Sequence, residues 1–423
     1  MAGLNVLIER ALRNHLLVVF FGTSVAAGLG FISNVFMARS ISIENFGSLA
    51  FFYTCIVSVF SISEIGFGAH YVVKANESRN PHYQGSINEL NSLYRLVMRK
   101  LSFPLGLVAT ASTSYVYDLS AIDAIGIFVG AFCLIQHKYL LSVNQAHADW
   151  TRFSIFQSAP MVFRLIVYFF IIFGASVVFQ PFEMLDSTKY GLCVSLVISV
   201  LIVNLLTPGS YLARCHSGQK IRKYLLDGLP TQALINTAIV LFSRIDVFLL
   251  MYFVDSMGVA IYFAANSVAM IFPIITRSLM NYYMQKIAVS SNTQASSILR
   301  HQLKSVPVVI MMAVLLVFYG SDILAYFFGV QYSEGGNVLA VLSVGYLGGI
   351  IFTPFEAYFY SRDAPVVLKI KFMSIVTMVG LSLLLVETYG AVGIATALTI
   401  AKLTGWLMVT FFYSKVSSNE KTI

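Results

Sequence analysis

The chain has 423 residues, of which 58% are hydrophobic and only 11% charged, and its mean hydropathy is +0.79. Soluble domains are about one quarter charged, so this composition excludes a soluble globular protein and indicates an integral membrane protein. The net charge of +8 does not indicate a nucleic-acid partner, because the basic residues gather in the loops on one side of the predicted membrane spans.

About twelve apolar segments follow one another along the chain. Each is long enough for a helix to cross about 30 Å of hydrocarbon at 1.5 Å per residue. The alternating ten-residue segments of a transmembrane barrel do not occur in the sequence. We therefore predict an all-α integral membrane protein. Its spans are expected near 16–38, 47–72, 96–117, 122–146, 153–178, 188–206, 231–254, 258–285, 303–328, 335–360, 364–386 and 391–413.

The loops between these spans differ in charge on the two sides of the membrane. With the N-terminus in the cytoplasm, most lysines and arginines fall in inner loops, while the outer loops hold only Arg39 and Lys189 and collect acidic residues. This asymmetry follows the positive-inside rule. It predicts a multi-pass protein of the inner, cytoplasmic membrane with both termini in the cytoplasm.

The predicted spans divide into two equal sets. Residues 1–206 form an N-terminal lobe of six spans, 207–230 a polar cytoplasmic linker, and 231–423 a C-terminal lobe of six spans. An even number of spans per half gives both halves the same orientation, as in a parallel repeat. Transport sites commonly lie near the midplane between such repeats, so the architecture predicts a central cleft between two lobes.

A short motif recurs at corresponding places in the two halves. ENFGSLAFFY (44–53) and DSMGVAIYFA (255–264) each begin with an acid, continue with a glycine and run into an apolar helix. Glu44 and Asp255 are expected to cap the outer ends of the second and eighth spans. Gly47 and Gly258 then allow a tight turn or close helix packing. A chance match between two outer turns is the alternative to duplication.

We single out seven charged residues within the predicted spans, where an isolated charge costs at least about 2.5 kcal/mol and usually faces a cavity or a partner. By depth, Arg164, Arg244, Asp246 and Lys402 lie near the middle of the membrane. Their net charge of +2 suits an anionic group such as a diphosphate, which basic side chains hold by charge-assisted hydrogen bonds. Internal pairing is the alternative. Arg244 and Asp246 are poor partners because residues two apart point to different sides of a helix.

The other three charges, Glu64, Arg277 and Glu356, lie nearer the cytoplasmic side. Glu64 and Arg277 occupy similar depths on corresponding spans of the two halves. We expect these residues to act in gating, with an ion pair between Glu64 and Arg277 as one hypothesis. A static pair or two side chains that reach the membrane surface is the alternative.

The sequence contains little that indicates catalysis. The predicted outer loops are short, no nucleotide-binding motif is present, and the four cysteines have no metal-ligand spacing. We therefore predict no enzyme activity, no metal site and no bound cofactor. Tyrosines within the spans, such as Tyr53, Tyr168, Tyr262 and Tyr346, are candidates to line a cleft, but the sequence does not select among them.

Four segments, in order along the whole chain, resemble the multidrug/oligosaccharidyl-lipid/polysaccharide (MOP) exporter superfamily, and within it the Wzx-type O-antigen flippases. They are FISNVFMARSISIENFGSLAFF (31–52), FSISEIGFG (60–68), RIDVFLLMYFVDSMGVAIYFAAN (244–266) and ETYGAVGIATALTIAKLTGW (387–406). The major facilitator superfamily fits less well, because its Gly- and Arg-rich loop is replaced by KANESRNPHYQGSINEL (74–90). The first span also lacks the carboxylate of the superfamily's drug and sodium transporters.

The resemblance implies a flippase that moves an undecaprenyl-diphosphate-linked O-antigen or polysaccharide repeat unit to the periplasmic leaflet by alternating access. Arg164, Arg244 and Lys402 would contact the diphosphate or acidic sugars, and Asp246 would set their geometry or couple to an ion. Coupling to a proton or sodium gradient is left open. A polysaccharide polymerase and a chain-length regulator are possible partners in lipopolysaccharide biosynthesis. The alternative is a MATE-like exporter of small solutes or drugs.

Overall fold

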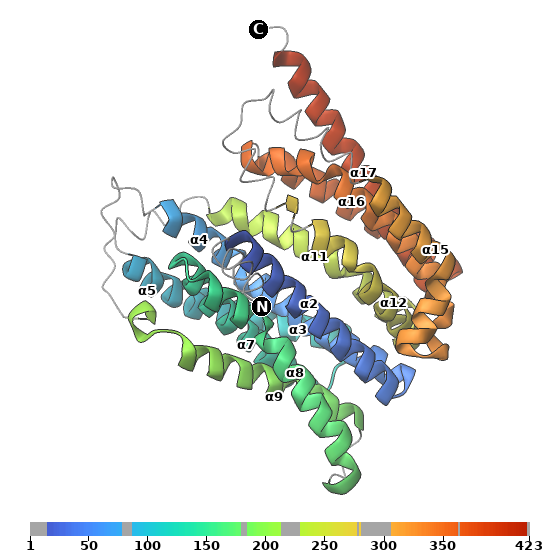
Figure 1. Cartoon of the computed structure of the whole chain (residues 1–423), viewed down its shortest axis with the longest axis horizontal. Coiled ribbons are helices and arrows are strands. Elements are labelled where there is room, and N and C mark those ends of the chain that lie inside the picture. The colour runs from blue at the N-terminus through green and yellow to red at the C-terminus, as the bar shows by residue number, and fades with distance from the viewer. Residues whose placement is uncertain are drawn as a thin grey trace, which may run out of the picture. The chain divides into compact units, whose positions relative to one another are not determined.

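The computed structural model describes residues 15–77, 87–178, 184–212, 229–276, 279–280, 306–362 and 364–420 (Figure 1). Within these ranges every regular element is a helix, which confirms the all-α prediction. The chain forms two compact units. Unit 1 comprises residues 1–33 and 52–240, and unit 2 comprises residues 34–51 and 241–423.

Unit 1 begins with the larger part of α2 (His15–Ser40) and the second half of α3 (Ile43–Glu64). Its other elements, in chain order, are α4 (Phe67–Glu77), α5 (Ile87–Val97), the π-helical turn η1 (Met98–Ser102), α6 (Phe103–Val116), α7 (Ala121–Ala146), α8 (Trp150–Val178), α9 (Met184–Leu206) and the 3-10 turn η2 (Gly209–Leu212). In this unit α7 packs against α4, α6, α8 and α9, so it is the central helix of the unit.

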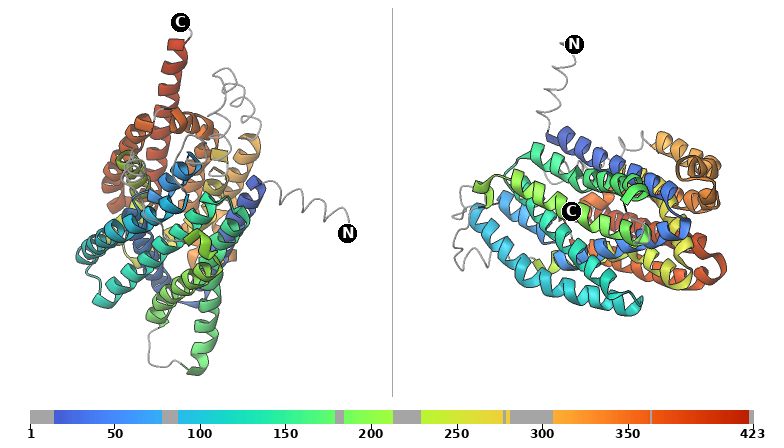
Figure 2. Two further views of the ribbon diagram at one scale, coloured as in Figure 1. Left: turned by 90° about the vertical axis from the view of Figure 1, so that its left-hand side faces the viewer. Right: turned by 90° about the horizontal axis from the view of Figure 1, so that it is seen from below.

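Unit 2 contains the ends of α2 and α3 and the second part of α11 (Leu229–Phe253). It continues with α12 (Ser256–Ala269), α15 (Val306–Phe328), the 3-10 turn η4 (Val330–Gly335), α16 (Gly336–Arg362) and α17 (Ala364–Glu420). Here α16 packs against α12, α15 and α17. Figure 2 shows α15 to α17, coloured orange to red, from two further sides.

Eight of the described helices are long and apolar enough to cross a membrane. The last of these contains two predicted spans, because α17 reverses direction at Gly390, where φ is +51°. The reversal brings Gly393 against the backbone carbonyl of Leu385, where a side chain on Gly393 would collide. Helices also cover the other predicted spans over their described residues. The protein is therefore a multi-pass membrane protein, as predicted.

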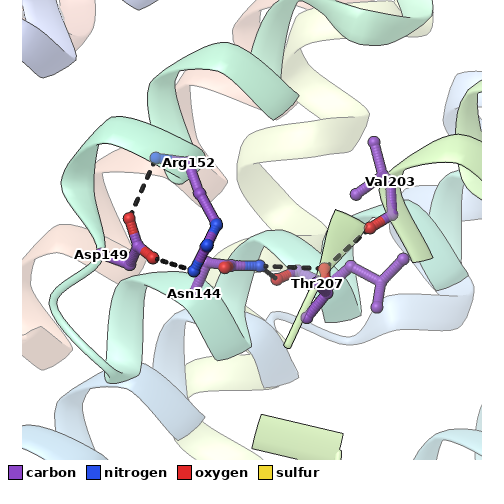
Figure 3. A network of polar contacts seen from close by, with 6 residues as sticks. Asn144, Asp149, Arg152, Val203 and Thr207 are labelled. Atoms are coloured by element: carbon purple, nitrogen blue, oxygen red, sulfur yellow. Dashed lines mark hydrogen bonds and ion pairs between the residues drawn. The ribbon is translucent and has the colours of Figure 1, made fainter. Parts of the chain in front are cut away.

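Polar contacts fix the ends of α7, α8 and α9 within unit 1 (Figure 3). Asn144 Nδ2 donates to Thr207 Oγ1 at 3.4 Å, and Thr207 Oγ1 donates to the Val203 carbonyl at 2.8 Å. In the turn after α7, Asp149 accepts from both the backbone N–H and the guanidinium of Arg152, at 3.1 and 2.8 Å. Asp149 thus caps the start of α8, and the hydrogen bond between Asn144 and Thr207 joins the ends of α7 and α9.

The two copies of the repeated motif begin their helices differently. Asp255 caps α12, because its Oδ1 accepts from the Gly258 N–H at 2.7 Å, as predicted. The corresponding prediction for Glu44 is wrong. The capping oxygen of α3 is Ser42 Oγ, which accepts from the Asn45 N–H at 3.3 Å. Glu44 lies in the first turn of α3, where its charge still favours the positive end of the helix dipole.

Residues 44–51 of the first copy and the whole second copy belong to unit 2, where the two copies contact each other. A Cβ on Gly47 would collide with the backbone carbonyl of Ser256 and lie 3.2 Å from the Ala260 nitrogen. The neighbouring Phe46 ring packs edge-to-face on Phe263 at 5.9 Å between ring centroids. Gly47 is therefore needed for the close approach of α3 to α12, as the sequence suggested.

The two cations that stand out in the predicted outer loops have structural partners. In unit 2, Arg39 donates to the backbone carbonyls of Tyr326 and Phe327, at the end of α15. Those carbonyls have no partner within their own helix. In unit 1, Lys189 Nζ lies 3.1 Å from Asp123 Oδ1 and links α9 to the start of α7. Both residues thus stabilise helix ends, which explains two cations on the side where acids otherwise predominate.

Candidate functional site

The buried carboxylate of Asp246 lies at the centre of the polar residues in unit 2. It projects from α11, and only 3% of the residue is exposed. Its Oδ2 accepts from the Tyr262 hydroxyl of α12 at 2.6 Å, and its Oδ1 accepts from the Val247 N–H at 2.9 Å. As expected from helix geometry, Asp246 forms no ion pair with Arg244 in the described part of the chain and finds its partner on another helix.

Lys402 approaches the same place from α17. Its Nζ lies over the ring of Tyr346 at 4.4 Å and over the ring of Phe242 at 5.4 Å. Within the described residues its ammonium has neither a hydrogen bond nor an ion pair. The faces of the two rings stabilise the cation, since the ring quadrupole attracts positive charge. Its three N–H donors remain available to a ligand.

Arg244 completes the polar cluster of unit 2. It is half-buried on α11, and its charge acts on both Asp246 and Tyr346. The Tyr346 hydroxyl donates to Asn266 Oδ1 at 2.9 Å, which ties α16 to α12. The structure thus brings three of the predicted site residues, Arg244, Asp246 and Lys402, together in one unit.

The fourth mid-membrane charge, Arg164, belongs to unit 1. It projects from α8 and is 5% exposed. Its Nη2 donates to the Gly30 carbonyl of α2 at 3.0 Å, and its guanidinium lies over the Tyr53 ring at 5.3 Å. Whether Arg164 also contacts substrate stays a prediction.

Tyrosine accompanies the mid-membrane charges in both units. Tyr53 lies beneath Arg164, Tyr262 donates to Asp246, and Tyr346 lies beneath Lys402. Tyr168, the fourth tyrosine that the sequence singled out, is one turn from Arg164 and 3% exposed. Sequence reasoning named these tyrosines without assigning roles, because their partners lie on helices that are distant in the chain.

The three residues expected in gating have different local environments. Glu356 forms an ion pair with Lys371, which joins α16 to α17. Glu64 accepts a hydrogen bond from the Gly68 N–H at 2.5 Å. Arg277 lies outside the described residues, so its pairing with Glu64 stays a prediction. Sequence reasoning also missed Tyr94 and Ser142, two buried hydroxyls near Glu64 on α5 and α7.

No group of three or more histidine, cysteine or acidic residues that could hold a metal ion occurs in the ranges that the structure describes. The cysteines Cys55, Cys133 and Cys193 are free and buried. The cationic and aromatic side chains near Asp246, such as Lys402 and Tyr346, can bind charged groups by hydrogen bonds, charge and aromatic contact.

By sequence, no family model matches the chain, and no curated protein matches it. Several solved structures, however, are similar to the chain over most of its length. The chain is similar to an inward-facing multidrug resistance MATE family transporter of the MOP superfamily, with a TM-score of 0.74 and 12% identity over 94% of this chain and 96% of that one. It is similar to the lipid II flippase MurJ in an inward closed conformation, with a TM-score of 0.72 and 13% identity over 93% and 87% of the two chains.

A third similar structure is a MOP superfamily transporter from Pyrococcus furiosus, described as having a binding pocket of reverse polarity. Its TM-score is 0.62, with 13% identity over 96% of both chains. These likenesses extend over nearly the whole chain. They show that the chain has the fold of MOP superfamily transporters, in agreement with the resemblance of its motifs.

Proposed function

We propose that the protein is a flippase that moves an undecaprenyl-diphosphate-linked oligosaccharide, such as an O-antigen repeat unit, from the cytoplasmic to the periplasmic leaflet. The fold supports a transporter of the MOP type, since both MATE transporters and a lipid II flippase have it. Because MurJ is a flippase for lipid II, a lipid-linked molecule is a reasonable substrate for this chain as well.

The unpaired ammonium of Lys402 is the observation that carries this proposal. A half-buried cation with no ion pair within the described residues is costly in a membrane, unless a ligand supplies the negative charge. Arg244 adds a second cation to the same unit. Two acids act on Lys402, but Asp246 is hydrogen-bonded to Tyr262 and Glu356 is paired with Lys371. This excess of positive charge suits a diphosphate, and it suits a cationic drug poorly.

The remaining features of the proposal follow from the sequence. The positive-inside pattern supports an inner-membrane location with both termini in the cytoplasm. Alternating access would carry the diphosphate past Arg164, Arg244 and Lys402 without a chemical step, so no enzyme activity is proposed. The same proposal includes a proton or sodium gradient that drives transport. It also includes contacts of the protein with a polysaccharide polymerase and a chain-length regulator.

Deletion of the gene tests the proposed direction and substrate. Lipid-linked repeat units are expected to accumulate in the cytoplasmic leaflet, where added impermeant glycosidases or lectins do not reach them in spheroplasts. The wild-type gene should restore periplasmic access, whereas Lys402→Met and Arg244→Gln should restore little. Arg152→Gln is the matched control, because Arg152 is an exposed arginine that pairs only locally with Asp149.

The same strains address export of small solutes or drugs, which the likeness to multidrug MATE transporters keeps as the second candidate. Loss of drug resistance on deletion, with normal periplasmic access of lipid-linked sugars, would favour that candidate. Accumulation of lipid-linked units with unchanged drug resistance would favour the flippase.

A further inference from the structure

The helix that follows the first motif breaks at a buried acid in unit 1. α3 ends at Glu64, Ile65 and Gly66 take φ values of 51° and 67°, and α4 begins at Phe67. A left-handed conformation is unfavourable for a branched residue such as Ile65, so the surrounding structure must hold the break in place. The break leaves carbonyls in the last turn of α3 without helical partners. In transporters, such half-helix ends often coordinate small cations.

Glu64 places a carboxylate at this break. It is 5% exposed, and its Oε1 accepts from the Gly68 N–H, which fixes it at the start of α4. No basic group in the described residues lies within ion-pair distance of it. The charge of Lys138, on α7, acts on Glu64 only from farther away. The carboxylate therefore lacks the direct cationic partner that a buried acid normally has.

Two buried hydroxyls point to the same place from other helices. Tyr94 of α5 is 0% exposed and Ser142 of α7 is 1% exposed; the two hydroxyls face each other, and neither forms a well-aligned hydrogen bond to any other described residue. Both come close to Gly68. A Cβ on that glycine would stand 2.6 Å from Glu64 Oε1, 2.8 Å from Ser142 Oγ and 3.0 Å from the Tyr94 hydroxyl. Three oxygens from three helices thus converge in front of one glycine.

We propose that a sodium ion binds between Glu64, Tyr94 and Ser142. Hard cations take oxygen ligands, and this group supplies a carboxylate and two hydroxyls beside the end of a helix. One carboxylate balances one positive charge, and the nearby Lys138 disfavours a divalent ion. A bound ion would also add a partner to two buried hydroxyls that otherwise meet only each other. Its role as the coupling ion rests on the proposed transport function.

Binding of radioactive sodium to the purified full-length protein tests the site without a transport assay. Wild-type protein should bind sodium in competition with unlabelled sodium and not with choline. Ser142→Ala and Tyr94→Phe should each weaken sodium binding by about tenfold or more, the usual effect of removing one supporting group from an ion site. Ser199→Ala is the control, because Ser199 also has a buried, unpartnered hydroxyl, but on α9.

Lys138→Gln provides a change in the opposite direction. It removes a nearby positive charge and should strengthen sodium binding severalfold. Glu64→Gln should abolish binding, and the milder Ser142→Ala keeps the test valid if Glu64→Gln does not fold. No competed sodium binding by wild-type protein, or equal binding by Ser142→Ala, Tyr94→Phe and Ser199→Ala, would overturn the site. Sodium binding in a protein that does not move lipid-linked sugars would leave the site intact and overturn the proposed function instead.

Discussion

The hydrogen bond between Tyr262 and Asp246 gives a quantitative prediction about the free energy of unfolding. Tyr262→Phe removes only the hydroxyl that donates to Asp246 Oδ2 at 2.6 Å and leaves the ring in its fully buried position. A hydrogen bond to a charged group contributes about 1.5–3 kcal/mol. Hydrogen bonds between helices in membranes average about 0.6 kcal/mol. Because both side chains are buried and their oxygens are only 2.6 Å apart, we predict a value in the upper range.

A double-mutant cycle isolates this value. Wild type, Tyr262→Phe, Asp246→Asn and the double variant are unfolded in mixed micelles, and the free energies of unfolding are compared. Labelling of the buried thiols Cys55, Cys133 and Cys193 reports unfolding. A coupling energy of about 1.5 kcal/mol or more is expected. A coupling below about 0.6 kcal/mol would refute the assignment of Asp246 as the acceptor of a strong hydrogen bond from Tyr262.

Three further predictions concern stability. Gly47→Ala should lower the free energy of unfolding by about 1–3 kcal/mol, because its Cβ meets the Ser256 carbonyl, while Gly28→Ala, with open space at that position, should not. Arg39→Ala should lower the free energy of unfolding by about 1.5–3 kcal/mol, because the last carbonyls of α15 lose their donor. Arg39→Lys should restore only part of this free energy in equilibrium unfolding. A double-mutant cycle on Lys189 and Asp123 should give about 1 kcal/mol that falls at high salt; a coupling of zero at low salt would contradict the assigned pair.

Much of the fold could be predicted because a membrane imposes a simple rule on the sequence. Each span must be long, apolar and helical, so the helix positions follow from composition alone. The break in the second span could not be predicted in the same way. It depends on Glu64 reaching the Gly68 N–H and on neighbours from α5 and α7, none of which leaves a periodic signal.

The candidate site was predicted in part for a related reason. Charges in apolar segments are conspicuous, so Arg164, Arg244, Asp246 and Lys402 could be selected from the sequence. Their partners could not, because a tyrosine in a span resembles any other aromatic residue until the helices are assembled. The capping residue of α3 was also misassigned. Ser42 and Glu44 are both common near helix starts, and only the geometry of the turn distinguishes them.

The central claim is that cations left in the apolar spans recognise a diphosphate. Its most direct test compares the binding of a polyprenyl diphosphate-linked sugar and of its monophosphate analogue to the purified protein, for wild type and for Lys402→Met. The diphosphate should bind wild type about tenfold or more tightly than the monophosphate, and Lys402→Met should lose most of this preference. Equal binding of the two ligands by wild type, or an unchanged preference in Lys402→Met, would contradict the account.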